Sequence, residues 1–274
     1  MAAGTAAAEG MRLWPDDARF VHLRGLAYFR LGNLTAAQQD LLQTQKMAPT
    51  DTDAVFDLGL VYMAQRQYED AARQFETTLK DPKKSGEGIS HVMLGRAYQN
   101  SNRSEAAIEQ FKSALQVEPN IELGHYHLGF AYESLGRNQE ALSEYEKELA
   151  RTQHSSAKEN AEVYYQYGNV LAEVGRFNDA LVPLGKALVL KPGHADAQYE
   201  LGKCLLNLGR TEVAVTALKR SAELAPESPN PQYLLSRALA KLGDKDGAKQ
   251  ALDRFLTLKK AQKDSGGMAT GRIR

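Results

Sequence analysis

Seven alanines recur at one fixed position along this 274-residue chain, each twelve residues after a small residue that we call the anchor. The anchors are Gly25, Gly59, Gly95, Gly129, Gly168, Gly202 and Ser236, and the alanines are Ala37, Ala71, Ala107, Ala141, Ala180, Ala214 and Ala248. Four of the six intervals between anchors are 34 residues, and the others are 36 and 39. Periods of about 20–50 residues indicate a repeat architecture, so we expect one small module copied seven times.

Each copy is predicted to be two helices joined by a tight turn. In the third copy, apolar residues follow helical spacing before the turn, as at Leu94 and Tyr98, and again after it, as at Ile108 and Phe111. Five copies have glycine in the turn, where a left-handed helix end favours a residue without a side chain: Gly32, Gly136, Gly175, Gly209 and Gly243. Polar residues follow, and we expect them to cap the second helices: Thr35, Ser104, Asn138, Asn178 and Thr211.

This layout resembles the tetratricopeptide repeat (TPR) family. The resemblance is carried by the Leu-Gly pair at the anchor (as at Leu58 and Gly59), the tyrosine three residues on, the alanine twelve on and a closing proline such as Pro82. It covers about residues 16–260 and implies an all-α fold, a right-handed α-α superhelix, in which first helices line a concave groove. The physics agrees, because one hairpin cannot bury its apolar face alone and neighbouring copies must stack.

Three segments are expected from this pattern. Residues 1–15 are read as a partial repeat or an N-terminal cap helix, with a shortened chain as the alternative explanation. Residues 16–260 form the seven-repeat TPR solenoid, with insertions at 83–88 and 152–160. Residues 261–274 are polar and glycine-containing, which predicts a disordered tail.

Charge and hydropathy narrow the classes of partner. The chain has 34 basic and 34 acidic residues without a long block of one sign, which argues against nucleic-acid binding. No apolar run reaches the roughly 18 residues that a membrane-spanning helix needs. The N-terminus lacks the pattern of a signal peptide. The compartment is therefore unknown, and a chain that is complete as printed would be expected in the cytoplasm.

No sequence signature of catalysis or cofactor binding is visible. The HExxH, CxxC and GxSxG motifs are absent, so we expect no catalytic residue, no cofactor and no metal site. His91 and His125 occupy equivalent positions in adjacent copies, but packing explains them better than a metal does. The single cysteine, Cys204, occupies a position that is alanine in other copies and is read as a small buried apolar residue.

The resemblance also implies where a partner would bind. In the family, residues three before, two before, one after and four after the anchor point into the groove. We therefore expect contacts with a peptide or partner segment from Phe56, Leu60, Met93, Tyr126, Phe130, Tyr165, Gln166, Asn169, Tyr199, Lys203, Tyr233 and Arg237. Tyrosines at the first of these positions also pack against the next repeat, so a role in the core is the alternative.

One known binding mode of the family is not expected. Some members hold the acidic C-termini of chaperones in a clamp of Lys, Asn and Arg from the first three copies. The matching positions here are His22, Leu26, Asp57, Ile89 and Met93. These side chains cannot reproduce that clamp.

The sequence therefore predicts a non-catalytic scaffold that binds a protein or peptide partner in its groove. The alternative is the TPR binding arm of a larger enzyme or cell-envelope assembly system whose catalytic part is not in this chain. A third hypothesis is a homo-oligomer formed through uncapped ends of the array.

Overall fold

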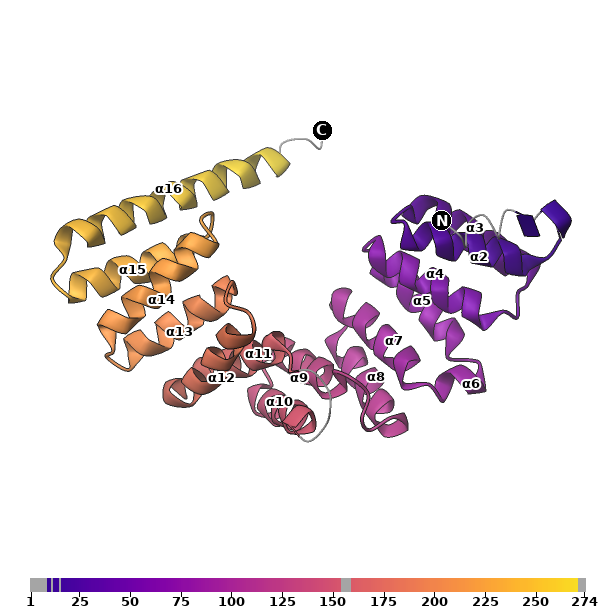
Figure 1. The fold of residues 1–274 in the computed structure, drawn as a ribbon, viewed down its shortest axis with the longest axis horizontal. Helices are drawn as coiled ribbons and strands as arrows, with labels where there is room; N and C mark the ends of the chain where they lie inside the picture. The colour runs from indigo at the N-terminus through magenta and orange to yellow at the C-terminus, as the bar shows by residue number, and fades with distance from the viewer. Residues whose placement is uncertain (1–8, 11, 15, 154–158, 271–274) are drawn as a thin grey trace. The chain divides into compact units, whose positions relative to one another are not determined.

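The computed structural model describes residues 9–10, 12–14, 16–153 and 159–270. Regular structure in this part of the chain is entirely helical (Figure 1). The helices are α2 (Ala18–Arg30), α3 (Leu34–Met47), α4 (Thr52–Ala64), α5 (Tyr68–Thr78), α6 (Pro82–Ser85), α7 (Gly88–Asn100), α8 (Ser104–Val117), α9 (Gly124–Ser134), α10 (Asn138–Gln153), α11 (Ala161–Glu173), α12 (Phe177–Leu190), α13 (Ala195–Asn207), α14 (Thr211–Leu224), α15 (Pro229–Lys241) and α16 (Lys245–Thr270).

The chain divides into two compact units, Met1–Glu140 and Ala141–Arg274, and α10 crosses the boundary. In unit 1, the hairpins α2/α3, α4/α5 and α7/α8 stack in order, because α3 packs against α4 and α5 packs against α7. Helix α8 packs in turn against α9, the first helix of the next hairpin. In unit 2, the hairpins α11/α12, α13/α14 and α15/α16 pack through α12 with α13 and α14 with α15. Each unit is therefore a stack in which a hairpin contacts its neighbours in sequence, as the period predicts.

The anchors are small because a buried side chain lies directly against them. A Cβ atom added to Gly59 would lie 2.6 Å from the ring of Phe75, and one added to Gly202 would lie 2.6 Å from Leu218. Both large residues follow their anchors by sixteen positions and are fully buried. The alanines from Ala37 to Ala214 are also 0% exposed. The sequence signature thus marks the close crossing of the two helices of a hairpin.

The turns follow the prediction more closely than the helix caps do. All five turn glycines have positive φ, between 70° and 84°. Arg66 and Asn102 hold the same left-handed conformation in the two hairpins whose turns lack glycine. The predicted cap residues, however, lie inside their helices: Ser104 and Thr211 are the first residues of α8 and α14, after Arg103 and Arg210. The turn ends one or two residues earlier than expected, so these side chains do not occupy the capping position.

The insertions and the ends show where the array departs from its period. The insertion at 83–88 begins within the short helix α6, and residues 154–158 of the second insertion lie outside the described residues. Helix α16 continues to Thr270, whereas disorder was predicted from residue 261. The run from Lys259 to Lys263 contains no glycine or proline, and its strong helix formers favour the helix as far as residue 263. Residues 271–274 and most of 1–15 lie outside the described part, and the cap hypothesis stays a prediction.

Candidate functional site

Each unit presents what we call a first-helix face, formed by the exposed side chains of the first helices of its hairpins. In unit 1 these helices include α4, α7 and α9, and in unit 2 they are α11, α13 and α15. Helices α7 and α9 contact each other, as do α11 with α13 and α13 with α15. None of the twelve predicted contact residues is fully buried, so the structure leaves part of every one of them accessible.

The first-helix face of unit 1 carries the apolar members of the predicted set. Phe56 and Leu60 lie on α4, Met93 lies on α7, and Tyr126 and Phe130 lie on α9. The rings of Tyr126 and Phe130 stack with their centroids 6.3 Å apart. The ring of Phe56 packs against that of buried Phe75 at 5.4 Å, so this residue serves the core as well as the surface.

Charged groups near Phe56 are largely paired with one another. His22 Nε2 lies 2.7 Å from Asp57 Oδ2, and this hydrogen bond raises the pKa of His22 despite partial burial. Lys84 Nζ lies 2.7 Å from Asp53 Oδ1 and 5.9 Å from the centroid of the Phe56 ring. Lys84 belongs to α6, so the first insertion folds back onto α4 instead of forming an open loop.

A second histidine on this face is kept neutral. The ring of His127 stacks on that of Phe111 at a centroid distance of 5.4 Å. Burial, with a smaller contribution from the charge of Arg96, lowers the pKa of His127 to about 4. At neutral pH this residue therefore acts as an aromatic surface and not as a cation.

In unit 2, α11 supplies one aromatic and two amide side chains of the predicted set. The ring of Tyr165 lies 4.6 Å from that of His194, which is buried and accepts a hydrogen bond from the N-terminus of α13. Tyr165 therefore also supports the next hairpin. Gln166 Nε2 donates to Glu162 Oε1 at 3.3 Å, and Asn169 Nδ2 lies 3.5 Å from Glu173 Oε1. Both amides remain partly exposed.

Helix α13 supplies Tyr199 and Lys203. Tyr199 is half-buried and packs against the C-terminal core, and burial raises the pKa of its hydroxyl. Lys203 Nζ donates to Glu200 Oε2 at 2.8 Å, and Glu200 is only 7% exposed. Burial is the largest single effect and opposes the charged form of Lys203, but the hydrogen bond to Glu200 and the electrostatic attraction of Glu200 and its neighbours together raise the pKa of the lysine. The charge of Lys203 is thus balanced within its own helix.

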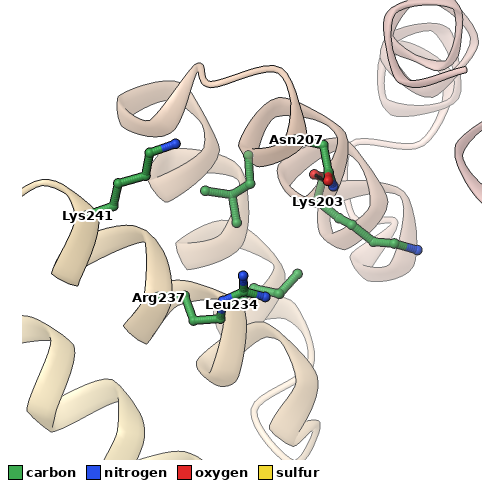
Figure 2. A pocket seen from close by; sticks show the side chains of 6 residues that line it. Lys203, Asn207, Leu234, Arg237 and Lys241 are labelled. Carbon is green, nitrogen blue, oxygen red and sulfur yellow. Dashed lines mark hydrogen bonds between the residues drawn. The ribbon is translucent and has the colours of Figure 1, made fainter. Parts of the chain in front are cut away.

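Helix α15 supplies the two most accessible members of the set. Tyr233 is 44% exposed, and its ring packs against that of Phe255 at 5.3 Å. The guanidinium of Arg237 lies 5.9 Å from the centroid of the Tyr233 ring. Arg237 also borders a cavity of about 150 Å³ between α13 and α15, which Figure 2 shows. The cavity is lined by Lys203, Leu206, Asn207, Leu234, Arg237 and Lys241.

Four of these cavity residues were not among the twelve predicted contacts. Leu206 and Leu234 stand at positions that the family resemblance assigns to the groove, four after and two before their anchors. The other two are Asn207 and Lys241. Each follows its anchor by five positions, which is one residue beyond the last position that the family resemblance assigns to the groove. Their relation to predicted residues could have revealed them. Asn207 lies four residues after Lys203, and Lys241 lies four after Arg237, so each pair shares one face of its helix.

The described residues offer little for catalysis or metal binding. They contain no group of three or more His, Cys, Asp or Glu side chains arranged to hold a metal ion. His91 is engaged by Gln110 Oε1 at 2.9 Å and by the Ser85 carbonyl at 3.1 Å. Cys204 is fully buried, and burial raises the pKa of its thiol to about 11. A thiol in that state is a poor nucleophile.

Comparison with family models decides the family. Three separate tetratricopeptide repeat models match residues 18–51, 56–87 and 95–136. The first match covers the hairpin α2/α3, the second begins inside α4 and runs through α5 and α6, and the third begins inside α7 and runs through α8 and α9. The chain is a TPR protein. The TPR fold predicted from the anchors, an all-α solenoid of helical hairpins, is confirmed.

A fourth model covers the rest of this TPR array. It describes the middle TPR-like domain of Cilia and flagella-associated protein 70 and matches residues 125–259. No curated protein sequence matches the chain. None of the described helices of this TPR protein is long and apolar enough to cross a membrane.

Solved TPR structures share the fold at low sequence identity. YrrB, described as a TPR protein with an unusual peptide-binding site, is 22% identical, with a TM-score of 0.58 over 68% of this chain and 93% of YrrB. The Cut9–Hcn1 hetero-tetramer of the APC/C is 17% identical, with a TM-score of 0.70 over 86% of this chain and 45% of that chain. A TPR protein from Parabacteroides merdae is 13% identical, with a TM-score of 0.66 over 88% of this chain and 93% of that protein.

Proposed function

We propose that this TPR protein is a non-catalytic scaffold whose first-helix face in unit 2 binds an extended segment of a partner protein. One observation carries the proposal: α11, α13 and α15 contact in series, Asn169 and Tyr199 are partly exposed on them, and Arg237 borders a cavity between α13 and α15. Aromatic and arginine side chains dominate the energetics of protein interfaces, because they bury a large area for few rotatable bonds. The peptide-binding site of YrrB, which has a similar fold, supports the proposal.

The first-helix face of unit 1 is a second proposed contact surface. Leu60, Met93 and Phe130 are partly exposed apolar side chains there, and the nearby charges of His22 and Lys84 are already paired. This surface suits an apolar segment better than a charged one. The proposal for unit 2 does not depend on it.

The alternative function is that of a binding module within a larger assembly. The model that matches residues 125–259 is named for the middle domain of a longer protein, which favours this alternative. An enzyme or a cell-envelope assembly system would then supply the chemistry, and this chain would supply the binding surface. The peptide contact would be the same in both cases.

A display experiment tests the proposal. We would select random twelve-residue peptides on the immobilised full-length chain and measure the Kd of the enriched peptides by fluorescence anisotropy. A variant with Asn169→Ala and Tyr233→Ala should bind at least tenfold more weakly, because truncating two contact residues costs about 1 kcal/mol or more each. The control, Val182→Ala with Val189→Ala, changes two residues of α12 that are 78% and 75% exposed, and its affinity should be unchanged.

Two results would overturn the proposal. One is a selection in which no peptide is enriched on the chain over an empty surface. The other is enriched peptides whose Kd is the same for the Asn169/Tyr233 variant as for the parent. Far-UV circular dichroism of each variant would confirm that the helices are intact.

A further inference from the structure

The cavity between α13 and α15 has an excess of positive charge that the chain itself does not neutralise. Three cations line it, namely Lys203, Arg237 and Lys241. Lys203 is paired with Glu200. Among the described residues, neither Arg237 nor Lys241 has an acidic ion-pair partner. The acidic residue nearest to Lys241 in sequence, Asp244, accepts from the backbone N–H of Gly247 at 2.9 Å and so caps α16.

The arrangement of these two cations suits a carboxylate. Arg237 and Lys241 are four residues apart on α15, so they project from one face of the helix, and Figure 2 shows both beside the cavity. A guanidinium presents a planar fork of donors that matches the two oxygens of a carboxylate, and an ammonium adds a point charge. Leu206 and Leu234 form the apolar part of the lining, where side-chain methylene groups would pack.

A second hollow adjoins this cavity on the other side of Arg237. It lies between α15 and α16, has a volume of about 380 Å³ and shares Arg237 with the cavity. Its apolar lining includes Tyr233, Ala240 and Leu252, and Leu252 is 41% exposed. A large apolar side chain placed there would cover apolar surface that the chain leaves in water.

We infer that the last two copies bind an acidic segment of a partner protein. An Asp or Glu side chain of the partner is held by Arg237 and Lys241, and a nearby large apolar side chain fills the hollow between α15 and α16. The inference rests on the proposed function, because it names the chemistry of the segment that the first-helix face of unit 2 receives. It also uses the sixth and seventh copies, whereas the chaperone clamp of the family uses the first three.

The same peptide selection tests this inference separately. The displayed peptides contain no phosphate, so only carboxylates can supply the negative charge. We expect enriched peptides to contain Asp or Glu close to Leu, Ile, Phe or Trp. Replacing the acidic residue of an enriched peptide by Asn or Gln should weaken binding at least tenfold, and the affinity should fall as salt is raised, because salt screens exposed charges.

Matched variants of the protein locate the effect. Arg237→Gln with Lys241→Gln should lose at least tenfold in affinity for the acidic peptide and should bind its Asn or Gln version about as the parent does. The control, Lys191→Gln with Arg210→Gln, removes one lysine and one arginine that are exposed outside the cavity, and it should keep the parent affinity.

Each outcome separates the two proposals. Enriched peptides without acidic residues, or equal affinities of the Arg237/Lys241 variant and its control, would overturn the inference and leave the scaffold function standing. A selection without any enriched peptide would overturn both.

Discussion

At the scale of single residues, a close crossing of two helices restricts the size of a side chain, whereas an exposed side chain at the edge of a cavity is under no such restriction. The anchors and alanines could be predicted because a close helix crossing tolerates only small side chains, and the repeat displays that restriction seven times. Lys241 could not be found in this way. It is exposed, its neighbours do not restrict it, and the corresponding residues of other copies, such as Ala64 and Glu173, have different chemistry. Only the structure shows that it borders a cavity with Arg237.

The anchor glycines provide the first prediction. Gly202→Ala should lower the free energy of unfolding by about 1–3 kcal/mol, because its Cβ would lie 2.6 Å from Leu218 and a tightly packed core resists the added methyl group. Gly185→Ala in α12 should instead raise it by about 0.5–1 kcal/mol, because its Cβ meets nothing within 4 Å and alanine favours the helix. Urea denaturation measures both. Equal effects of the two substitutions would contradict the assignment of the anchors.

His127 provides a prediction about pH. Its pKa is about 4 in the folded chain, below the 6.5 of a free histidine, so the unfolded chain binds more protons between these two values. This contribution to stability is complete above pH 6.5 and is lost as the pH falls towards 4. His127→Phe keeps an aromatic ring against Phe111 and removes the titration. Between pH 7 and pH 5 the variant should therefore lose less stability than the parent, by on the order of 1–2 kcal/mol.

Denaturation of both proteins at the two pH values measures this difference. Comparing the variant with the parent cancels the other titrating groups, including His22, whose raised pKa acts in the opposite direction. Identical pH dependence of the two proteins would show that His127 is not kept neutral by burial.

At the scale of elements, hairpins were predictable and their exact limits were not. Glycine marks five turns because it adopts positive φ without strain, but Arg66 and Asn102 adopt the same conformation without a sequence signal. Tertiary packing of the flanking helices fixes the turn there. Helix α6 in the first insertion was likewise not predictable, because the contact of Lys84 with Asp53 on α4 is absent from any local sequence pattern.

The strained turn of the second copy gives a prediction for this scale. Arg66 has a φ of 60°, and it is exposed. Arg66→Gly should raise the free energy of unfolding by roughly 0.5–1 kcal/mol. A side chain in the left-handed region costs about 1–2 kcal/mol, which glycine removes. Glycine also gives the unfolded chain more conformational freedom, which offsets part of this gain. Arg73→Gly, an exposed position inside α5, should lower it by about 1 kcal/mol. If thermal denaturation shows that Arg66→Gly is no more stable than the parent, the turn is not strained.

At the scale of the whole molecule, the period predicted the stacking of hairpins but could not identify the partner. Stacking follows from apolar residues that recur in every copy. Binding depends on exposed side chains that differ between copies, such as Leu60 in unit 1 and Arg237 in unit 2. The twelve predicted contacts therefore stay a prediction, although the structure leaves all of them accessible. The homo-oligomer hypothesis also stays a prediction. Leu252 and Leu256 are exposed on α16, in the last copy of the array.

The central claim is that the first-helix face of unit 2 receives a partner segment, and a hydrogen-exchange footprint tests it most directly. The full-length chain would be measured alone and with a saturating amount of the tightest selected peptide. Amides of α11, α13 and α15 should exchange more slowly with the peptide bound, because binding lowers the population of locally opened states. Amides of α12 and α14 should change much less. Protection confined to α12 and α14, or protection nowhere in unit 2, would contradict the account.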